Sequence, residues 1–181
     1  MTKTILYIAT SLDGYIADAQ HKLDWLTSFD GQGEDFNYSS FYARIGAVIM
    51  GSTTFEDVLQ LSPQQYPYAD VRSYVVTRRS ISVPSGHDIH LWSSDFADLL
   101  RDARAYSAAK ERDIWLVGGG KLASAFFANG WIDEIILTIM PVMLGAGIPL
   151  FHSGQAHLSH WRLDKVEHWH TGVVQMHYSK A

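Results

Sequence analysis

The sequence predicts one α/β domain over residues 1–181, built in three layers from a mostly parallel mixed sheet, helices on both of its faces and a C-terminal antiparallel hairpin. Three observations predict this class. Short apolar runs typical of buried strands alternate with longer segments of helical periodicity. Two of these runs end in glycine where a helix is expected to begin. Residues 161–178 alternate polar and apolar side chains around Thr171-Gly172, as a closing hairpin does.

The individual elements follow from local signals. Strands are expected at residues 4–9, 47–50, 73–77, 89–92, 114–117, 134–140, 161–169 and 173–178. Helices are expected at residues 35–44, 53–61, 95–110 and 121–128. Thr53 and Glu56 form a capping-box pattern at the start of the second helix, and Asn129-Gly130 is typical of the end of the fourth. Residues 11–33, 60–71 and 141–160 are predicted to be loops because glycine, proline and polar residues are frequent there.

Composition excludes several classes of protein. The chain is 47% hydrophobic and 18% charged, which is typical of a globular domain and not of a disordered chain. Its net charge of −5 argues against general binding to nucleic acid. The longest apolar stretch, residues 135–150, is interrupted by proline and glycine, so no membrane span is expected. The absence of cysteine excludes disulfides and thiol catalysis, and it fits a cytoplasmic location.

Two strand-to-helix junctions share one design, at residues 48–54 and 115–121. In each, a buried strand ends in glycine (Gly51, and Gly118 to Gly120) and a helix follows at once. Free backbone N–H groups at a helix start attract anions, and glycine lets a phosphate approach the backbone. The pair could therefore hold the two ends of a dinucleotide pyrophosphate, or the glycines could simply form tight turns. Neither junction has the common dinucleotide-binding or P-loop pattern.

A third strand runs into Thr77-Arg78-Arg79. A hydroxyl group and an arginine at a strand end suit an adenosine 2′-phosphate, which would favour NADP over NAD. The alternative is a solvated pair of surface arginines. Histidines are frequent near the C-terminus (His152, His157, His160, His168 and His170), but no metal-ligand spacing accompanies them, so no metal is expected.

Five motifs, in this order, resemble the dihydrofolate reductase-like superfamily, and within it the reductase domain of bifunctional riboflavin-biosynthesis deaminase-reductases and their stand-alone bacterial relatives. The motifs are SLDGYIA (11–17), VIMGSTTFE (48–56), LVGGGKL (116–122), IDE (132–134) and PVMLGAGIPLF (141–151). They span nearly the whole chain, and the last one points to the riboflavin-type branch.

The resemblance implies a dihydrofolate reductase-like fold and an NADPH-dependent reductase. It places Ala9, Ile16 and Ala17 at the nicotinamide, Gly51, Ser52, Thr53, Thr54, Gly118, Gly119, Gly120, Lys121 and Leu122 at the pyrophosphate, and Thr77 and Arg78 at the adenosine end. True dihydrofolate reductases usually carry arginine where this chain has Ser52, which leaves the grip on a 2′-phosphate to Arg78 or Arg79.

The resemblance also suggests residues for the substrate half. Counting back without gaps from residues 50–51 puts Asp35 at the position of the active-site acid, where a raised pKa would suit a proton donor. The alternative is that Asp35 only favours a helix start. Asp13, Trp25 and Arg72 are further substrate-binding candidates. Their alternatives are a loop-shaping turn for Asp13, a core anchor for Trp25 and an exposed loop arginine for Arg72.

The expected function is hydride transfer from NADPH to a C=N or C=O group of a small heterocyclic substrate. The family's natural substrate is a pyrimidine, which gives the 5-amino-6-(5-phosphoribosylamino)uracil reductase type. The alternatives are a true dihydrofolate reductase and a non-catalytic nucleotide-binding protein of the same fold. The resemblance further implies a homodimer.

Overall fold

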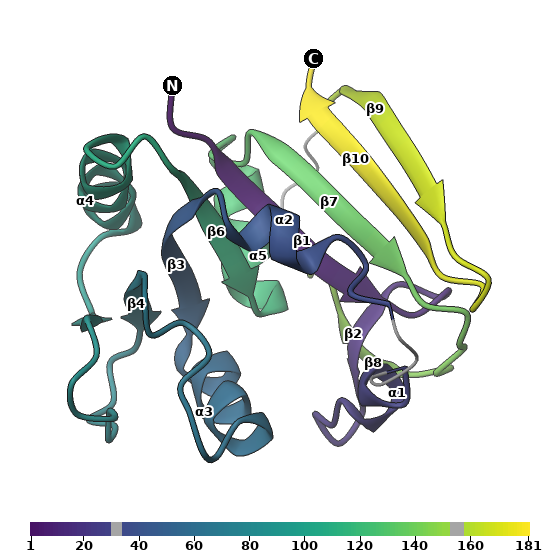
Figure 1. The fold of residues 1–181 in the computed structure, drawn as a ribbon, viewed down its shortest axis with the longest axis horizontal. Helices are drawn as coiled ribbons and strands as arrows, with labels where there is room; N and C mark the ends of the chain where they lie inside the picture. The colour runs from purple at the N-terminus through teal and green to yellow at the C-terminus, as the bar shows by residue number, and fades with distance from the viewer. Residues whose placement is uncertain (30–33, 153–157) are drawn as a thin grey trace.

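A computed structural model describes residues 1–29, 34–152 and 158–181. Its main sheet has eight strands in the order β5-β4-β3-β6-β1-β7-β10-β9 (Figure 1). The strands are β1 (Thr4–Thr10), β3 (Ile45–Gly51), β4 (Arg72–Val76), β5 (Ile89–Trp92), β6 (Asp113–Gly118), β7 (Glu134–Ile139), β9 (Trp161–His168) and β10 (Val174–Lys180). The pairs from β5 to β7 are parallel, whereas β10 runs antiparallel to both β7 and β9. The expected mixed sheet with its closing hairpin is confirmed.

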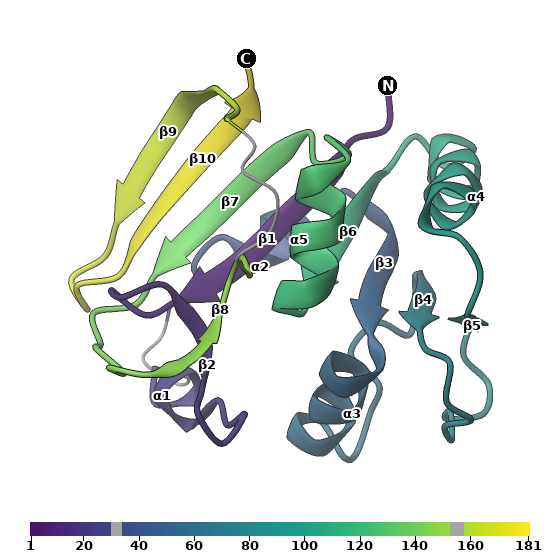
Figure 2. The same ribbon diagram turned by 180° about the vertical axis from the view of Figure 1, so that it is seen from behind.

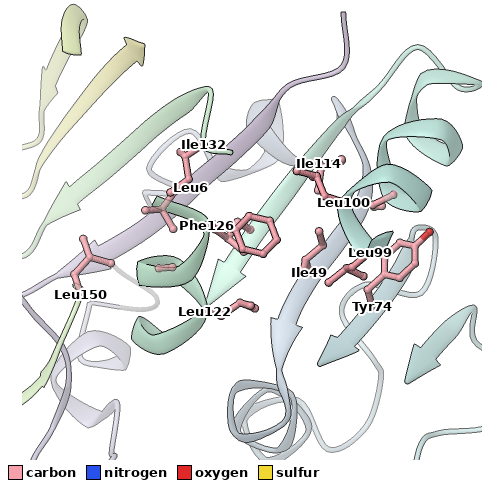
Figure 3. Packing of buried hydrophobic residues seen from close by; sticks show 14 residues of the cluster. Leu6, Ile49, Tyr74, Leu99, Leu100, Ile114, Leu122, Phe126, Ile132 and Leu150 are labelled. Carbon is pink, nitrogen blue, oxygen red and sulfur yellow. The ribbon is translucent and has the colours of Figure 1, made fainter. Parts of the chain in front are cut away.

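Helices cover both faces of this sheet, so the predicted three layers are confirmed. On one face, α4 (Phe96–Ala108) and α5 (Gly120–Ala128) pack their apolar sides against the strands (Figure 2). Phe126 of α5 is fully buried and belongs to the same hydrophobic cluster as Leu99 and Leu100 of α4 (Figure 3). On the other face, α2 (Tyr38–Tyr42) and α3 (Ser52–Leu61) bury Phe41 and Phe55 against the strands. In the described ranges, no helix is both long enough and apolar enough to cross a membrane.

Two predicted loops contain structure that the sequence patterns did not indicate. Within residues 11–33 lie β2 (Tyr15–Asp18) and the short α1 (Asp24–Thr27), and within residues 141–160 lies β8 (Gly147–Pro149). The strands β2 and β8 pair antiparallel as a separate small sheet. Gly147 is required in this pair, since a Cβ there would lie 2.2 Å from the Ala17 carbonyl oxygen. Both strands are too short to show an alternating pattern.

The helix predicted at residues 35–44 is also shorter than expected. Only Tyr38–Tyr42 is helical, because Phe36 and Asn37 adopt left-handed backbone conformations with φ of 49° and 63°. A non-glycine residue in this region of φ interrupts a helix. The segment therefore turns sharply before α2, and this turn determines where Asp35 lies.

Candidate functional site

A cavity of about 1020 Å³ opens at the carboxyl ends of β1, β3 and β6. The same end of the molecule carries β2, β8, α1 and α3, whereas both chain termini lie at the opposite end (Figures 1 and 2). Ligands of open α/β sheets usually bind at the carboxyl ends of the strands. The cavity is therefore the candidate site.

The two glycine junctions meet at this cavity. α3 begins at Ser52 and α5 at Gly120, so the free N–H groups of both first turns lie at the cavity. A Cβ on Gly119 would lie 3.3 Å from the Thr54 hydroxyl oxygen, which shows how close the junctions are to each other. A Cβ on Gly120 would lie 2.4 Å from the Pro149 carbonyl oxygen, so only glycine fits there.

Most of the predicted cofactor-binding residues line the cavity. They are Ala9, Ile16, Ala17, Gly51, Ser52, Thr53, Thr54, Gly119, Gly120, Lys121 and Leu122. Gly118, which joins Gly119 through a cis peptide bond, is not part of the lining. Thr77 and Arg78 also lie outside it.

The structure separates the roles of the two adjacent arginines. The Arg79 guanidinium donates to the Ser52 hydroxyl at 3.1 Å and to the Glu56 carboxylate at 3.0 Å, so this side chain is tied to α3. The Thr77 hydroxyl accepts a hydrogen bond from the Arg79 backbone N–H at 2.9 Å. Arg78 is exposed and has no ion pair with any described residue. Of the pair, Arg78 is the one whose charge is available to a ligand.

Aromatic side chains form one wall of the cavity. Trp115 lies at the centre, with ring centroids 5.3 Å from Tyr68, 5.8 Å from Tyr7 and 5.9 Å from Tyr38. Its indole N–H donates to the Tyr7 carbonyl oxygen at 3.0 Å, which fixes the orientation of the ring. All four residues line the cavity, and sequence analysis missed them because they come from four separate segments. Such a wall suits a flat ligand.

Tyr7 is the tyrosine of this wall with the most informative acid–base behaviour. Its hydroxyl donates to the Phe36 carbonyl oxygen at 3.3 Å, and burial raises its pKa from 10.0 to about 12. Because this folded-state pKa lies above the unfolded value, ionisation favours the unfolded chain. The stability that Tyr7 contributes is complete below pH 10 and is lost as the pH rises toward about 12.

When the pH is raised from about 9 to about 11, we therefore expect the free energy of unfolding to fall less in a Tyr7→Phe variant than in the parent. Urea unfolding followed by circular dichroism at the two pH values measures this difference. A Tyr178→Phe variant on β10, outside the cavity lining, controls for the removal of a hydroxyl group. An equal alkaline loss in the parent and in Tyr7→Phe would contradict the expectation.

Asp35 lines the cavity, but not as expected. Its carboxylate accepts hydrogen bonds from the backbone N–H groups of Asn37 at 3.0 Å and Ser39 at 3.2 Å. Hydrogen bonds from Ser39 lower the pKa of Asp35, and the bond from the Ser39 side chain has the larger effect. The expectation of a raised pKa at Asp35 is therefore wrong, because hydrogen bonds to the charged form outweigh burial at this exposed position.

A second carboxylate, Asp57 on α3, has the raised pKa. Burial at the cavity wall is the main cause, and the nearby His21 opposes it. Sequence analysis missed Asp57, although a signal was present. Thr54, Asp57, Val58 and Leu61 share one face of the helix, so the junction that brings Thr54 to the cavity brings the others as well.

Three other predicted residues lie outside the cavity lining. The Asp13 carboxylate accepts hydrogen bonds from the backbone N–H groups of Leu144 at 3.2 Å and Gly145 at 2.7 Å, so it ties two loops together. Trp25 is half-buried on α1. Arg72 begins β4, at the end of the sheet opposite the cavity, and pairs with Asp88 at 3.0 Å. Asp13 therefore has a structural role, as its alternative supposed, although it holds a second loop and not only its own turn. Arg72 is not the exposed loop arginine of its alternative, because it is half-buried in a strand.

A buried amide supports the floor of the cavity. Gln175 on β10 is fully buried, and its amide N–H₂ donates to the Phe36 carbonyl oxygen at 3.1 Å and to the Thr138 hydroxyl at 2.9 Å. Its carbonyl oxygen accepts from the Asn37 amide at 3.3 Å and lies 3.0 Å from the His177 ring nitrogen Nε2. Phe36 and Thr138 line the cavity. The C-terminal hairpin therefore holds the sharp turn before α2 in place.

No metal centre is found among residues 1–29, 34–152 and 158–181, where no group of three acidic or histidine side chains could hold an ion. His157 lies outside these residues.

The mixed sheet with helices on both faces and two glycine junctions at one cavity defines the class of α/β domain to which this chain belongs. The sequence matches the RibD C-terminal domain over residues 2–175, and the chain belongs to this family. A putative riboflavin biosynthesis protein from Shewanella sp. PV-4 has the same fold, with a TM-score of 0.85 and 29% identity over 99% of each chain.

Two further relatives extend the comparison. The uncharacterized protein YwjB of Bacillus subtilis (strain 168) is 40% identical over 99% of this chain and 98% of its own length. A deaminase and 5-amino-6-(5-phosphoribosylamino)uracil reductase from Thermotoga maritima shares the fold, with a TM-score of 0.69 and 17% identity over 99% of this chain and 57% of that one. The riboflavin-type, dihydrofolate reductase-like fold expected from the motifs is confirmed.

Proposed function

We propose that this protein is an NADPH-dependent reductase that transfers a hydride to a C=N or C=O carbon of a small heterocycle of the aminopyrimidine class. The observation that supports this best is the meeting of two helix N-termini at one side of a cavity whose other wall is aromatic. Family membership is the second support.

The residues present fit the cofactor. Gly119, Gly120 and Lys121 line the cavity where α5 begins, so a pyrophosphate can lie against the free backbone N–H groups of that helix, with Lys121 beside it. The first turn of α3 can receive the other phosphate. Ala9, Ile16 and Ala17 are small or apolar and suit the nicotinamide ring. When bound, NADPH supplies the hydride, which carries two electrons, and leaves as NADP⁺.

Reduction of C=N or C=O also needs a proton on the heteroatom. Asp57 fits this role better than Asp35, because burial keeps its proton bound to a higher pH, whereas Asp35 is held in its charged form. The aromatic wall would orient the ring and exclude water from the reacting carbon.

Binding of the reduced cofactors, followed by quenching of tryptophan fluorescence, tests the proposal. We expect tighter binding of NADPH than of NADH, and oxidation of NADPH, seen as loss of its absorbance, in the presence of an aminopyrimidine substrate. Failure to bind either cofactor would contradict the proposal and favour a non-catalytic role. Methotrexate binding with turnover of dihydrofolate would instead indicate a true dihydrofolate reductase.

We expect Arg78→Ala to weaken NADPH binding by about tenfold or more, since a charge-assisted contact to the 2′-phosphate is worth about 1.5–3 kcal/mol. NADH lacks this phosphate, so its affinity should not change. Fluorescence titration of both cofactors measures the difference. Arg101→Ala is the matched control, since Arg101 is an exposed arginine on α4 that pairs only with Asp98 among the described residues. An equal loss for both cofactors would contradict a role in 2′-phosphate recognition.

The homodimer implied by the sequence resemblance also stays a prediction, and sedimentation equilibrium would test it.

A further inference from the structure

In the part of the cavity away from the two helix starts, acidic side chains outnumber basic ones. Among the described residues, three carboxylates line the cavity, those of Glu34, Asp35 and Asp57. Lys121 is the one lysine or arginine in the lining that the described residues provide, and it lies in the first turn of α5, at the cofactor end. Of the two histidines that the described part of the chain places in the lining, His152 packs beside Gly120 at the same end, and His21 lies near Asp57.

The arginines of the chain are placed elsewhere. Those that form ion pairs in the described structure are Arg44 with Glu134, Arg72 with Asp88, Arg79 with Glu56, Arg101 with Asp98, Arg104 with Asp133 and Arg162 with Asp164. Arg112 donates to the Ile45 carbonyl oxygen, and Arg78 is exposed beyond the end of β4. The sequences of residues 30–33 and 153–157 contain neither lysine nor arginine.

This distribution bears on what the substrate half can bind. Proteins hold phosphate groups with arginine, lysine or the N-terminus of a helix. In the described structure, the two long helices that begin at the cavity both do so at the cofactor end. A dianionic phosphate placed in the substrate half would instead face carboxylates, and Asp35 stays charged because hydrogen bonds from Ser39 lower its pKa.

The same groups favour a different ligand. Carboxylate oxygens accept hydrogen bonds from ring N–H and exocyclic amino groups, and these bonds are strengthened by charge. The wall formed by Tyr7, Tyr38, Tyr68 and Trp115 offers faces and edges against which a planar ring can pack. The carboxylates and the aromatic wall together therefore favour a flat heterocycle that is rich in amino groups.

We propose that the substrate is a planar, amino-substituted heterocycle that carries no phosphate. This inference rests on the proposed reductase function and narrows its substrate class. It distinguishes the chain from the Thermotoga maritima relative, whose name specifies a phosphoribosylamino substrate. The corresponding ligand here is the ribosylamino form without the phosphate.

A matched pair of ligands tests this inference. The protein saturated with NADP⁺ is titrated by calorimetry with 5-amino-6-(5-phosphoribosylamino)uracil and with its dephosphorylated counterpart. We expect the dephosphorylated ligand to bind at least about tenfold more tightly. Equal binding, tighter binding of the phosphorylated ligand, or binding of neither would overturn the inference. Failure of the proposed function is seen separately, as the absence of NADPH binding before either ligand is added.

An Asp35→Asn variant tests whether the Asp35 carboxylate is responsible for the preference for the dephosphorylated ligand. Asparagine keeps one oxygen, which can accept the shorter of the two backbone hydrogen bonds, from Asn37, so the fold should persist, which thermal unfolding checks. We expect weaker binding of the dephosphorylated ligand and no loss for the phosphorylated one, so that the preference falls several-fold. A purely structural role would weaken both ligands equally. Asp98→Asn on α4 is the same chemical change outside the cavity and should leave the preference unchanged.

Discussion

Replacing Gly120 by alanine is expected to weaken NADPH binding by about tenfold or more, which corresponds to about 1.4 kcal/mol. The added Cβ would lie 2.4 Å from the Pro149 carbonyl oxygen and 3.0 Å from the His152 ring, and the first of these atoms belongs to backbone. Either the first turn of α5 or β8 must therefore move. Both line the proposed cofactor site, through Lys121 and Ile148. Overpacking of this kind also costs about 1–3 kcal/mol of stability.

Fluorescence titration with NADPH and thermal unfolding measure the two effects of Gly120→Ala. Gly51→Ala is the informative comparison, because a Cβ at Gly51 meets nothing within 4 Å and the residue has an ordinary extended conformation with φ of −77°. We expect its unfolding temperature to stay close to that of the parent. Unchanged NADPH affinity in Gly120→Ala would show that the start of α5 does not hold the cofactor.

Replacing Gln175 by leucine is expected to cost about 3 kcal/mol of folding free energy. The substitution keeps much of the volume but removes both donated hydrogen bonds, so that the Phe36 carbonyl oxygen and the Thr138 hydroxyl lose a buried partner. A buried polar group left without its partner costs about 1–3 kcal/mol. For a chain of this length, the unfolding temperature should fall by about 6–12 °C.

Thermal unfolding of Gln175→Leu should be compared with that of Met176→Leu. Met176 is the next residue of β10 and points to the opposite face of the sheet, so this control changes the same strand without touching the network. We also expect Gln175→Leu to weaken binding of a substrate-class ligand more than binding of NADPH, because Phe36 lines the cavity away from the helix starts. If Gln175→Leu lowers the free energy of unfolding by less than about 1 kcal/mol, the hydrogen bonds of Gln175 are not a main support of the cavity floor.

The parts of this molecule that the sequence predicted are those with a local signal. The strands that contain Ile49 and Leu116 are short apolar runs that end in glycine, and periodic apolar residues identify α4. The cofactor side of the cavity follows directly, because each junction carries its own helix start. Local patterns of apolar residues and glycine were therefore sufficient for the main sheet, for α3 to α5 and for the two glycine junctions, although not for β2 and β8.

The substrate half could not be predicted in this way, because pairing between distant segments creates it. Nothing near Gln175 in the sequence indicates that its amide will meet Phe36, and nothing in the Arg78-Arg79 pair shows which arginine Glu56 will hold. Asp35 was placed at the cavity by counting, but its pKa depends on the left-handed turn at Phe36 and Asn37. The hairpin holds that turn through the hydrogen bonds from Gln175 to Phe36 and from Asn37 to Glu167, and these partners are distant in the sequence.

Because the C-terminal hairpin supports the floor of the cavity, the two sides of the cavity are expected to fold at different times. The hydrogen bonds from Asn37 to Glu167 and from Gln175 to Phe36 join residues 130 and 139 positions apart. During synthesis, both glycine junctions have been made by residue 122, whereas the contacts of Gln175 require β10. A growing chain therefore has the residues that we propose bind the cofactor well before it can form the proposed substrate half of the cavity. Contacts of such long range also slow folding, so we expect recovery of the substrate half to be the late event when the denatured protein is returned to native conditions.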